Sequence, residues 1–311
     1  MIRRITLAAL LSLLAGGAAA QDYPSKPITF LIPQAPGGGT DLSVRMIEPA
    51  ASRALGQKIV LINRAGTATL FQLTQAAPDG YTLGVASTGN TASQPHNPGV
   101  PYERSDYIPI IQLTNVPSVL VAPANSPFNS VADVIAAARK GQALKVGTTA
   151  LGTSSQLAGV LVERSFGVKF TYVPHKSNGE VMTAILGGHL DLGSVDISSA
   201  APHLSAVKAL GVFTDERLKD APSLPTMKEQ GVKGTMGFYN IVIAPKGTPE
   251  PIIAKVHDAF RKAMEDPEVI AKARAANIPL AYLGPKASRA HMDEAYDLMG
   301  VLMRELGLSK K

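Results

Sequence analysis

The chain has 311 residues, no cysteine, no tryptophan and a formal net charge of +6 at pH 7. Without cysteine, disulfides and thiolate chemistry are excluded. The basic residues form no dense cluster with aromatic platforms, which argues against nucleic-acid binding, while the mild positive charge favours anionic ligands.

The first residues have the three parts of a secretory signal peptide. Arg3 and Arg4 are followed by the apolar run Leu7–Leu14 and by the small residues Ala18–Ala20. This pattern predicts that residues 1–20 are a signal peptide that is cleaved before Gln21. The apolar run is too short for a permanent membrane span, so we expect an exported, periplasmic protein.

The stretch that organises the chain is a strand, a glycine loop and a helix start. Ile28–Ile32 reads as a buried strand, and Gly37, Gly38 and Gly39 form the loop. Thr40 or Asp41 is expected to cap a helix that ends at Gly56. A helix N-terminus behind a glycine loop suits a carboxylate or phosphate, although a tight turn without a ligand is the alternative.

Alternating strands and helices follow, which predicts an α/β fold with a parallel sheet covered on both faces. A polar loop with Ser87 and Thr88 follows the strand Tyr81–Ala86. Ligands of such sheets bind beyond the carboxyl ends of the strands, so we expect these two residues at a binding site. The other elements expected here are a strand at Lys58–Ile62 and a helix at Leu70–Ala77.

A second unit repeats this arrangement. Ile108–Thr114 and Ser118–Val121 are expected to be two strands, and Ser130 with Asp133 forms a capping box. The strand Lys145–Gly147 leads into a polar loop that opens the helix Gln156–Phe166. The hydroxyls of this loop are candidates for binding an anion, with helix capping alone as the alternative; they belong to Thr148, Thr149, Thr153, Ser154 and Ser155.

Further strands end in candidate site residues. Lys169–Val173 is followed by His175, and the strand Leu190–Val195 ends at Asp196. Thr226 and Glu229 form a second capping box.

Two similar apolar segments suggest a clamshell. Leu120–Pro123 and Val242–Pro245 both end in Ala-Pro, and the chain between them is long enough for one inserted domain. We therefore expect crossovers near Val121 and Ile243. Lobe 1 would hold residues 21–120 and 241–311, lobe 2 would hold residues 121–240, and the helices of the tail would pack on lobe 1.

Several motifs together resemble one family, the Bug-type extracytoplasmic solute-binding proteins of tripartite tricarboxylate transporters. The resemblance spans essentially the whole mature chain. The segments that carry it are Tyr23–Ile28, Pro36–Asp41, Leu55–Gln57, Ala77–Leu83, Val173–Lys176, Leu186–Asp191 and Ala244–Pro249.

The resemblance implies a periplasmic-binding-protein fold, with two α/β lobes joined by two crossover strands. It implies that two facing loops, Pro36–Asp41 and Thr148–Ser155, grip a carboxylate with the help of water. Asp41 would organise its loop or hold water, since like charges repel. Asn63–Thr69 departs from the family pattern beside the cleft. Phe238-Tyr239 stands where many members have Trp, and we expect a packed hinge strand there.

His175 stands where the family often has tyrosine, and it would either donate to the carboxylate or face solvent. The other histidines show no metal-ligand spacing, so we expect no metal and no cofactor.

The predicted function is capture of a small carboxylate and its delivery to a tripartite tricarboxylate-type permease. The ligand would be an aliphatic di- or tricarboxylate, an acidic amino acid or an aromatic acid, and the protein a monomer. A periplasmic receptor for a sensor kinase is an alternative. An exported enzyme is disfavoured, because the sequence has no Gly-x-Ser-x-Gly, His-Glu-x-x-His or cysteine nucleophile.

Overall fold

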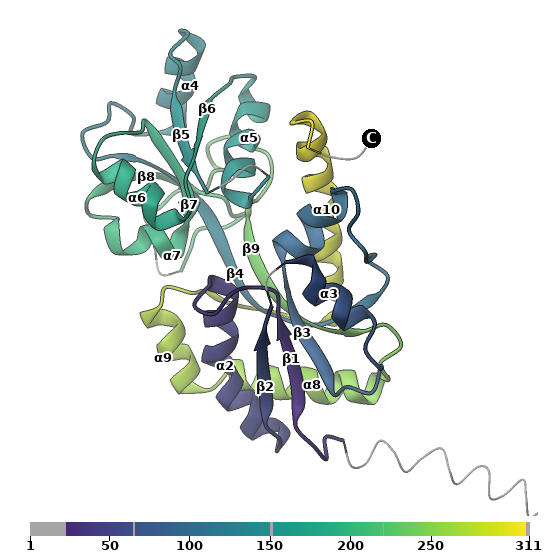
Figure 1. Cartoon of the computed structure of the whole chain (residues 1–311). Helices are drawn as coiled ribbons and strands as arrows, with labels where there is room; N and C mark the ends of the chain where they lie inside the picture. Colours follow the sequence, from purple (N-terminus) through teal and green to yellow (C-terminus); the bar gives the residue numbers. More distant parts are fainter. Residues whose placement is uncertain (1–22, 65, 150–151, 220, 309–311) are drawn as a thin grey trace, which may run out of the picture.

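The computed structural model describes residues 23–64, 66–149, 152–219 and 221–308. Figure 1 shows two α/β lobes joined by two long strands, β4 (Tyr107–Pro123) and β9 (Gly237–Pro245). The predicted α/β clamshell with two crossover strands is therefore confirmed. The predicted signal peptide, residues 1–20, lies outside the described residues. Across the described ranges, no helix combines the length and the apolar character that crossing a membrane requires.

Lobe 1 is built on three parallel strands that β9 and β4 extend in antiparallel fashion, in the spatial order β2-β1-β3-β9-β4. Strand β10 pairs with β4, and helices α2, α8 and α9 pack against one another. The bounds are β1 (Ile28–Ile32), α2 (Gly39–Leu55), β2 (Ile59–Asn63), α3 (Thr67–Thr74), β3 (Thr82–Ser87), η1 (Gly89–Ser93), η2 (Gln94–His96), α8 (Glu250–Met264), α9 (Pro267–Ala275) and β10 (Leu280–Leu283).

Lobe 2 has its own sheet, in which β5 lies between β6 and β7 and runs parallel to both. The end of β4 lies between β7 and β8 and runs antiparallel to them. The bounds are α4 (Val131–Arg139), β5 (Lys145–Thr148), α5 (Ser154–Phe166), β6 (Thr171–Pro174), α6 (Asn178–Leu186), β7 (Leu192–Asp196), α7 (Ile197–Ala200), η3 (Ala201–His203) and β8 (Val207–Val212).

Strand β4 is one element, and the expectation of two separate strands was wrong. It pairs with β9 up to Pro117 and with β7 and β8 from Ser118 onward. The register shifts just after Pro109, where the strand tolerates a residue that lacks a backbone N–H. The partner change of β4 lies between Pro117 and Ser118, a little before Val121, and the pairing of β4 with β9 ends at Gly237, the first residue of β9. The exact lobe boundaries stay a prediction.

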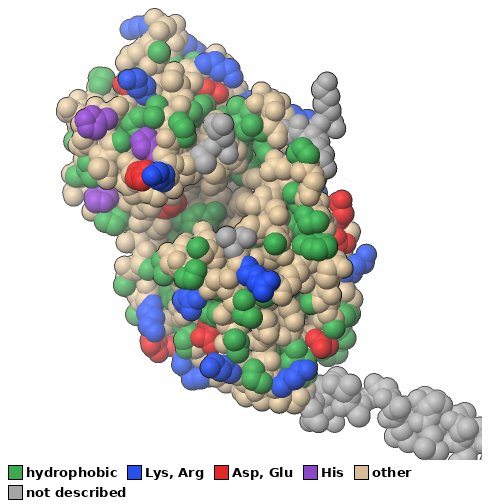
Figure 2. Space-filling model, in the orientation of Figure 1, with side chains coloured by type: hydrophobic (Ala, Val, Ile, Leu, Met, Phe, Trp, Pro, Cys, Tyr) green, Lys and Arg blue, Asp and Glu red, His purple; other side chains and the backbone are tan. Residues whose placement is uncertain are grey.

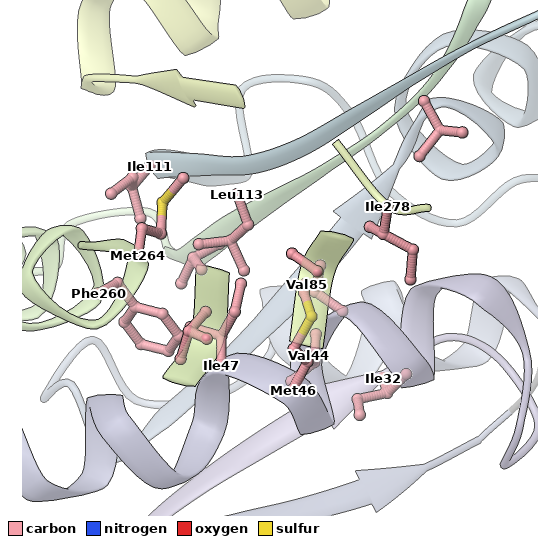
Figure 3. Close-up of a cluster of buried hydrophobic side chains, with 14 of the residues drawn as sticks. Ile32, Val44, Met46, Ile47, Val85, Ile111, Leu113, Phe260, Met264 and Ile278 are labelled. Atoms are coloured by element: carbon pink, nitrogen blue, oxygen red, sulfur yellow. The ribbon is translucent and has the colours of Figure 1, made fainter. Parts of the chain in front are cut away.

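The buried face of α2 anchors the core of lobe 1. Figure 3 shows Val44 and Ile47 of this helix beside side chains of β1, β3, β4 and α8, among them Val85 and Phe260. The labelled residues in this view are all buried.

Helix α10 (Pro285–Glu305) contacts both lobes, whereas we expected the tail to pack on lobe 1. Its first half is held by an ion pair between Asp293 and Arg104 of lobe 1. Its second half packs against α5, where Leu302 is fully buried and Arg164 pairs with Glu305 at 3.3 Å. Figure 1 shows the helix rising from lobe 1 beside α5. Helix α10 is therefore a third connection between the lobes.

Candidate functional site

A cavity of about 570 Å³ lies between the lobes, and Figure 2 shows the surface hollowed there. We call it the cleft. Lobe 1 contributes the loop before α2 and the segment after β3, and lobe 2 contributes the loop before α5 and the starts of α6 and α7. Asp196 is the only formally charged residue among the described residues that line the cleft. The described lining has no other aspartate, no glutamate, and no lysine, arginine or histidine.

The cleft gathers most of the predicted site residues from both lobes. Those that line it are Gly39, Thr40, Ser87, Thr88, Thr149, Thr153, Ser154 and Asp196. Those that lie outside the lining are Gly37, Gly38, Asp41, Thr148, Ser155 and His175. A role of any of them in ligand binding stays a prediction.

Asp41 is buried and organises the first loop, with a side chain only 1% exposed. Its carboxylate accepts hydrogen bonds from the Gly37 N–H at 2.8 Å, Arg45 Nε at 2.8 Å and Asn63 Nδ2 at 2.7 Å. Burial alone would raise the pKa of Asp41, but these donors outweigh burial and hold the pKa below its ordinary value. Because Asp41 is buried and lies outside the lining, its carboxylate is not presented to the cleft.

Helix α2 begins two or three residues earlier than expected. Its N-cap is Gly38, without a side-chain cap, so the prediction that Thr40 or Asp41 caps it was wrong. Gln34 supplies the missing acceptor instead, because its Oε1 accepts from the Thr40 N–H at 2.8 Å. The ring of Phe238 covers this helix end, and a Cβ added at Gly39 would lie 3.4 Å from it.

The second loop is fixed to β7 through Ser155. The Ser155 hydroxyl donates to the carbonyl oxygen of Ser194 and accepts from the Thr149 N–H at 3.2 Å. Thr153 is the N-cap of α5 without a side-chain cap bond, and its hydroxyl accepts from Thr149 Oγ1 at 3.2 Å. Ser154 has no side-chain partner among the described residues and lines the cleft. Ser155 thus positions the loop, and Ser154 is the hydroxyl presented to the cleft.

Asp196 stands at the end of β7 and caps the short helix α7. Its carboxylate accepts from the Ser199 N–H at 2.8 Å, from Ser198 Oγ at 2.5 Å and from Asn178 Nδ2. The residue is half-buried and lines the cleft. A negative charge therefore remains at the cleft surface, held in place by three donors.

Two segments that the sequence analysis placed beside the cleft lie outside its lining. His175 bonds through Nδ1 to the carbonyl oxygen of Val173 at 2.9 Å and does not line the cleft. In the Asn63–Thr69 segment, Asn63 supports Asp41, and Gly66–Thr69 also lie outside the lining.

Sequence reasoning missed several residues that line the cleft. Phe238 was expected to pack in the hinge, yet it faces the cleft, while its neighbour Tyr239 is buried. Met303 and Leu308 come from the far end of the chain, and no local signal connects them with the glycine loops. Other missed lining residues are Gln34, Gly89, Ser93, Gln94, Asn97, Gly152 and Asn178. Three of these stood within or beside a recognised stretch: Gly152 in the second loop, Gly89 directly after Thr88, and Gln34 beside the first glycine loop.

Comparison with known proteins agrees with this geometry. The family model for the tripartite tricarboxylate transporter family receptor matches residues 43–308. A solute-binding protein from Polaromonas, solved without ligand, superposes with a TM-score of 0.84 at 27% identity and covers 91% of this chain and 99% of its own.

Two solved structures from Rhodopseudomonas palustris contain a ligand, and each is 27% identical to this chain. MatC with bound malate has a TM-score of 0.72 and covers 90% of this chain and 99% of its own. A second protein, with adipate, has a TM-score of 0.75 and covers 93% and 99%. The chain belongs to the tripartite tricarboxylate transporter receptor family of periplasmic solute-binding proteins.

Proposed function

We propose that this protein is exported, captures a small carboxylate in the cleft and delivers it to a membrane permease of the tripartite tricarboxylate transporter type. The observation that carries the proposal is the meeting of two helix N-termini, those of α2 and α5, at one cavity. Such termini present N–H groups and a partial positive charge, which favour a carboxylate.

The polar lining supports a neutral mode of carboxylate binding. Thr40, Thr88 and Ser154 contribute hydroxyls to the cleft, whereas the Ser87 hydroxyl donates to Asn90 Oδ1 at 2.8 Å. The described lining contains no basic side chain. Aligned neutral donors can hold an anion as a set of charge-assisted hydrogen bonds. The relatives that contain malate and adipate support the same class of ligand.

We also propose that the protein has no catalytic activity. The described lining of the cleft contains no cysteine, histidine, lysine or tyrosine that could act as a nucleophile or general base. Its one carboxylate, Asp196, is engaged by three donors as a helix cap.

The test begins with protein expressed with its own leader and recovered from the periplasmic fraction, where we expect a chain that starts at Gln21. Thermal shift against a panel of aliphatic, amino and aromatic carboxylates identifies a ligand, because a bound ligand raises the melting temperature. Calorimetry on Ser154→Ala should then show a loss of about 1–3 kcal/mol in binding, since this substitution removes one donor to an anion.

Ser155→Ala is the matched control, because Ser155 bonds to Ser194 and Thr149 rather than lining the cleft. Ser155→Ala should lower thermal stability more than Ser154→Ala does.

Gly39→Val should weaken binding strongly by filling the space beside Phe238. If Ser154→Ala and Gly39→Val fold and bind like the parent, the carboxylate is held elsewhere. The proposed function would be contradicted if no carboxylate of the panel raised the melting temperature, or if NMR showed that the protein converts the ligand into a product.

A further inference from the structure

The charge of the cleft is unusual for a site that takes an anion. Asp196 is the only formally charged residue of its described lining, and that charge is negative. Arg45, the arginine nearest the first loop in sequence, is bound to Asp41 and lies outside the lining. A ligand that carries only carboxylates would bring like charge toward Asp196 without a compensating cation.

Asn178 adds a second acceptor beside Asp196. Its Nδ2 donates to the Asp196 carboxylate, which fixes the orientation of the amide, because the opposite orientation would place two acceptors face to face. The other end of the amide, Oδ1, is buried and has no hydrogen-bond partner among the described residues. Buried polar atoms are almost always paired in folded proteins, so an unpaired acceptor on a residue of the cleft indicates a missing donor.

Resting on the proposed function, we infer that the ligand carries an ammonium group as well as its carboxylate, and that Asn178 Oδ1 and Asp196 receive this group. The carboxylate lies at the N-termini of α2 and α5, and the ammonium lies at the start of α6 and the end of β7. An ammonium supplies both the missing donor and the missing positive charge. A hydroxyl supplies only the donor, so hydroxy acids rank between amino acids and plain carboxylates.

The experiment compares ligands that differ only in this group. The pairs are aspartate with succinate, glutamate with glutarate, and phenylalanine with 3-phenylpropionate. Calorimetry on the parent protein should show that the amino member of the pair that binds has a Kd at least tenfold lower than its partner. Malate should fall between aspartate and succinate if the four-carbon pair is the one that binds.

Variants test whether Asn178 is the specificity-determining residue. Asn178→Ala should lower the preference for the amino member at least fivefold, and Asn178→Ser, which keeps an acceptor, should restore part of it. Asn125→Ala is the matched control, because Asn125 of lobe 2 is exposed and lies outside the lining of the cleft, so this substitution should leave the preference unchanged. Melting temperatures without ligand show whether each variant is folded.

Two results would overturn the inference and leave the proposed function intact. One is equal or tighter binding of the plain carboxylate by the parent. The other is an unchanged preference in a folded Asn178→Ala variant. If neither member of any pair binds and the wider carboxylate panel also fails, the proposed function is contradicted together with the inference. The comparison of pairs on the parent needs no variant, so it stands even if Asn178→Ala does not fold.

Discussion

At the scale of single residues, a buried charge holds the first loop of the cleft. Asp41 joins the start of α2 to β2, because its carboxylate receives both the Gly37 N–H and the amide of Asn63. The Asn63 side-chain amide also donates to the Gln34 carbonyl oxygen at 3.0 Å, and its Oδ1 accepts a hydrogen bond from the Arg45 guanidinium. The loop therefore keeps its shape through side chains of its own lobe and does not depend on a ligand.

This arrangement predicts acid sensitivity. The pKa of Asp41 is lower in the folded protein, so its stabilising contribution is present above the unfolded pKa of about 3.9 and is lost as pH falls through the folded value. Asp41→Asn should lower the free energy of unfolding by about 1–3 kcal/mol at pH 7. The difference from the parent should shrink below about pH 4. Urea unfolding at several pH values measures this.

The control for this experiment is Asp258→Asn, because the Asp258 side chain is 77% exposed. Asp258→Asn should change the free energy of unfolding by less than about 0.5 kcal/mol at every pH measured. A difference between Asp41→Asn and the parent that stays constant from pH 7 to pH 3 would mean that the Asp41 charge does not stabilise the fold.

Residue patterns in the sequence could predict the two loops but not every role within them. The glycines and hydroxyls near the ends of β1 and β5 marked the right stretches, because local chain direction follows from the strand and helix that flank them. Which hydroxyl faces the cleft depends on a partner far along the chain, as Ser155 and Ser194 illustrate. The roles of Asn178 and Phe238 depend likewise on long-range contacts.

At the scale of elements, the close pairing of β4 with β9 near Pro117 depends on one glycine. A Cβ added at Gly237 would lie 2.5 Å from the carbonyl oxygen of Val116 and 2.8 Å from the Cα of Pro117. Both contacts are with backbone atoms, which cannot move aside like a flexible side chain. The two strands can therefore approach closely where β4 changes partners only because residue 237 lacks a side chain.

Gly237→Ala should lower the free energy of unfolding by about 1–3 kcal/mol, because the strands must separate to admit the methyl group. Gly179→Ala is the matched control, since Gly179 lies in helix α6 and its added Cβ would meet only ordinary contact at 3.7 Å. That control should stabilise the protein by about 0.5–1 kcal/mol. Chemical denaturation measures the stability of both variants, and equal stability of the two would contradict the close approach of β4 and β9 at Gly237.

Helix ends and capping boxes were the most predictable elements, because their signals are local. Gly56 ends α2 in a left-handed conformation, and Ser130 with Asp133 forms both bonds of a capping box. Thr226 and Glu229 also exchange two hydrogen bonds, although a turn follows them. The short strand β10 was not predicted, since its pairing with β4 comes from distant residues.

At the scale of the whole molecule, α10 contributes to the cores of both lobes. Met292 packs in a cluster with β3 and β9, and Leu302 packs in the cluster of lobe 2 with Leu157 of α5. Met303, next to Leu302, lines the cleft. Two lobes, two crossover strands and the family were within reach of the sequence. The packing of this helix was not, because its apolar stripe does not say which surface it covers.

Leu302→Ala should lower the free energy of unfolding by about 2–5 kcal/mol, because the side chain is fully buried. Scanning calorimetry should show a lower melting temperature together with a smaller enthalpy or a split transition. Leu186→Ala is the control, since Leu186 is 45% exposed and should change stability little. A melting temperature of Leu302→Ala equal to that of the control would mean that α10 does not hold the lobes together.

The shared helix also bears on the cooperativity of unfolding. In a protein whose lobes are joined only by flexible segments, each lobe can melt at its own temperature. Here lobe 2 cannot lose its core without exposing Leu302 and Met299, and the same helix carries the Asp293 ion pair of lobe 1. The parent protein should therefore melt in a single transition with equal calorimetric and van't Hoff enthalpies in the scans described above, and heat that loosens one lobe should loosen the other.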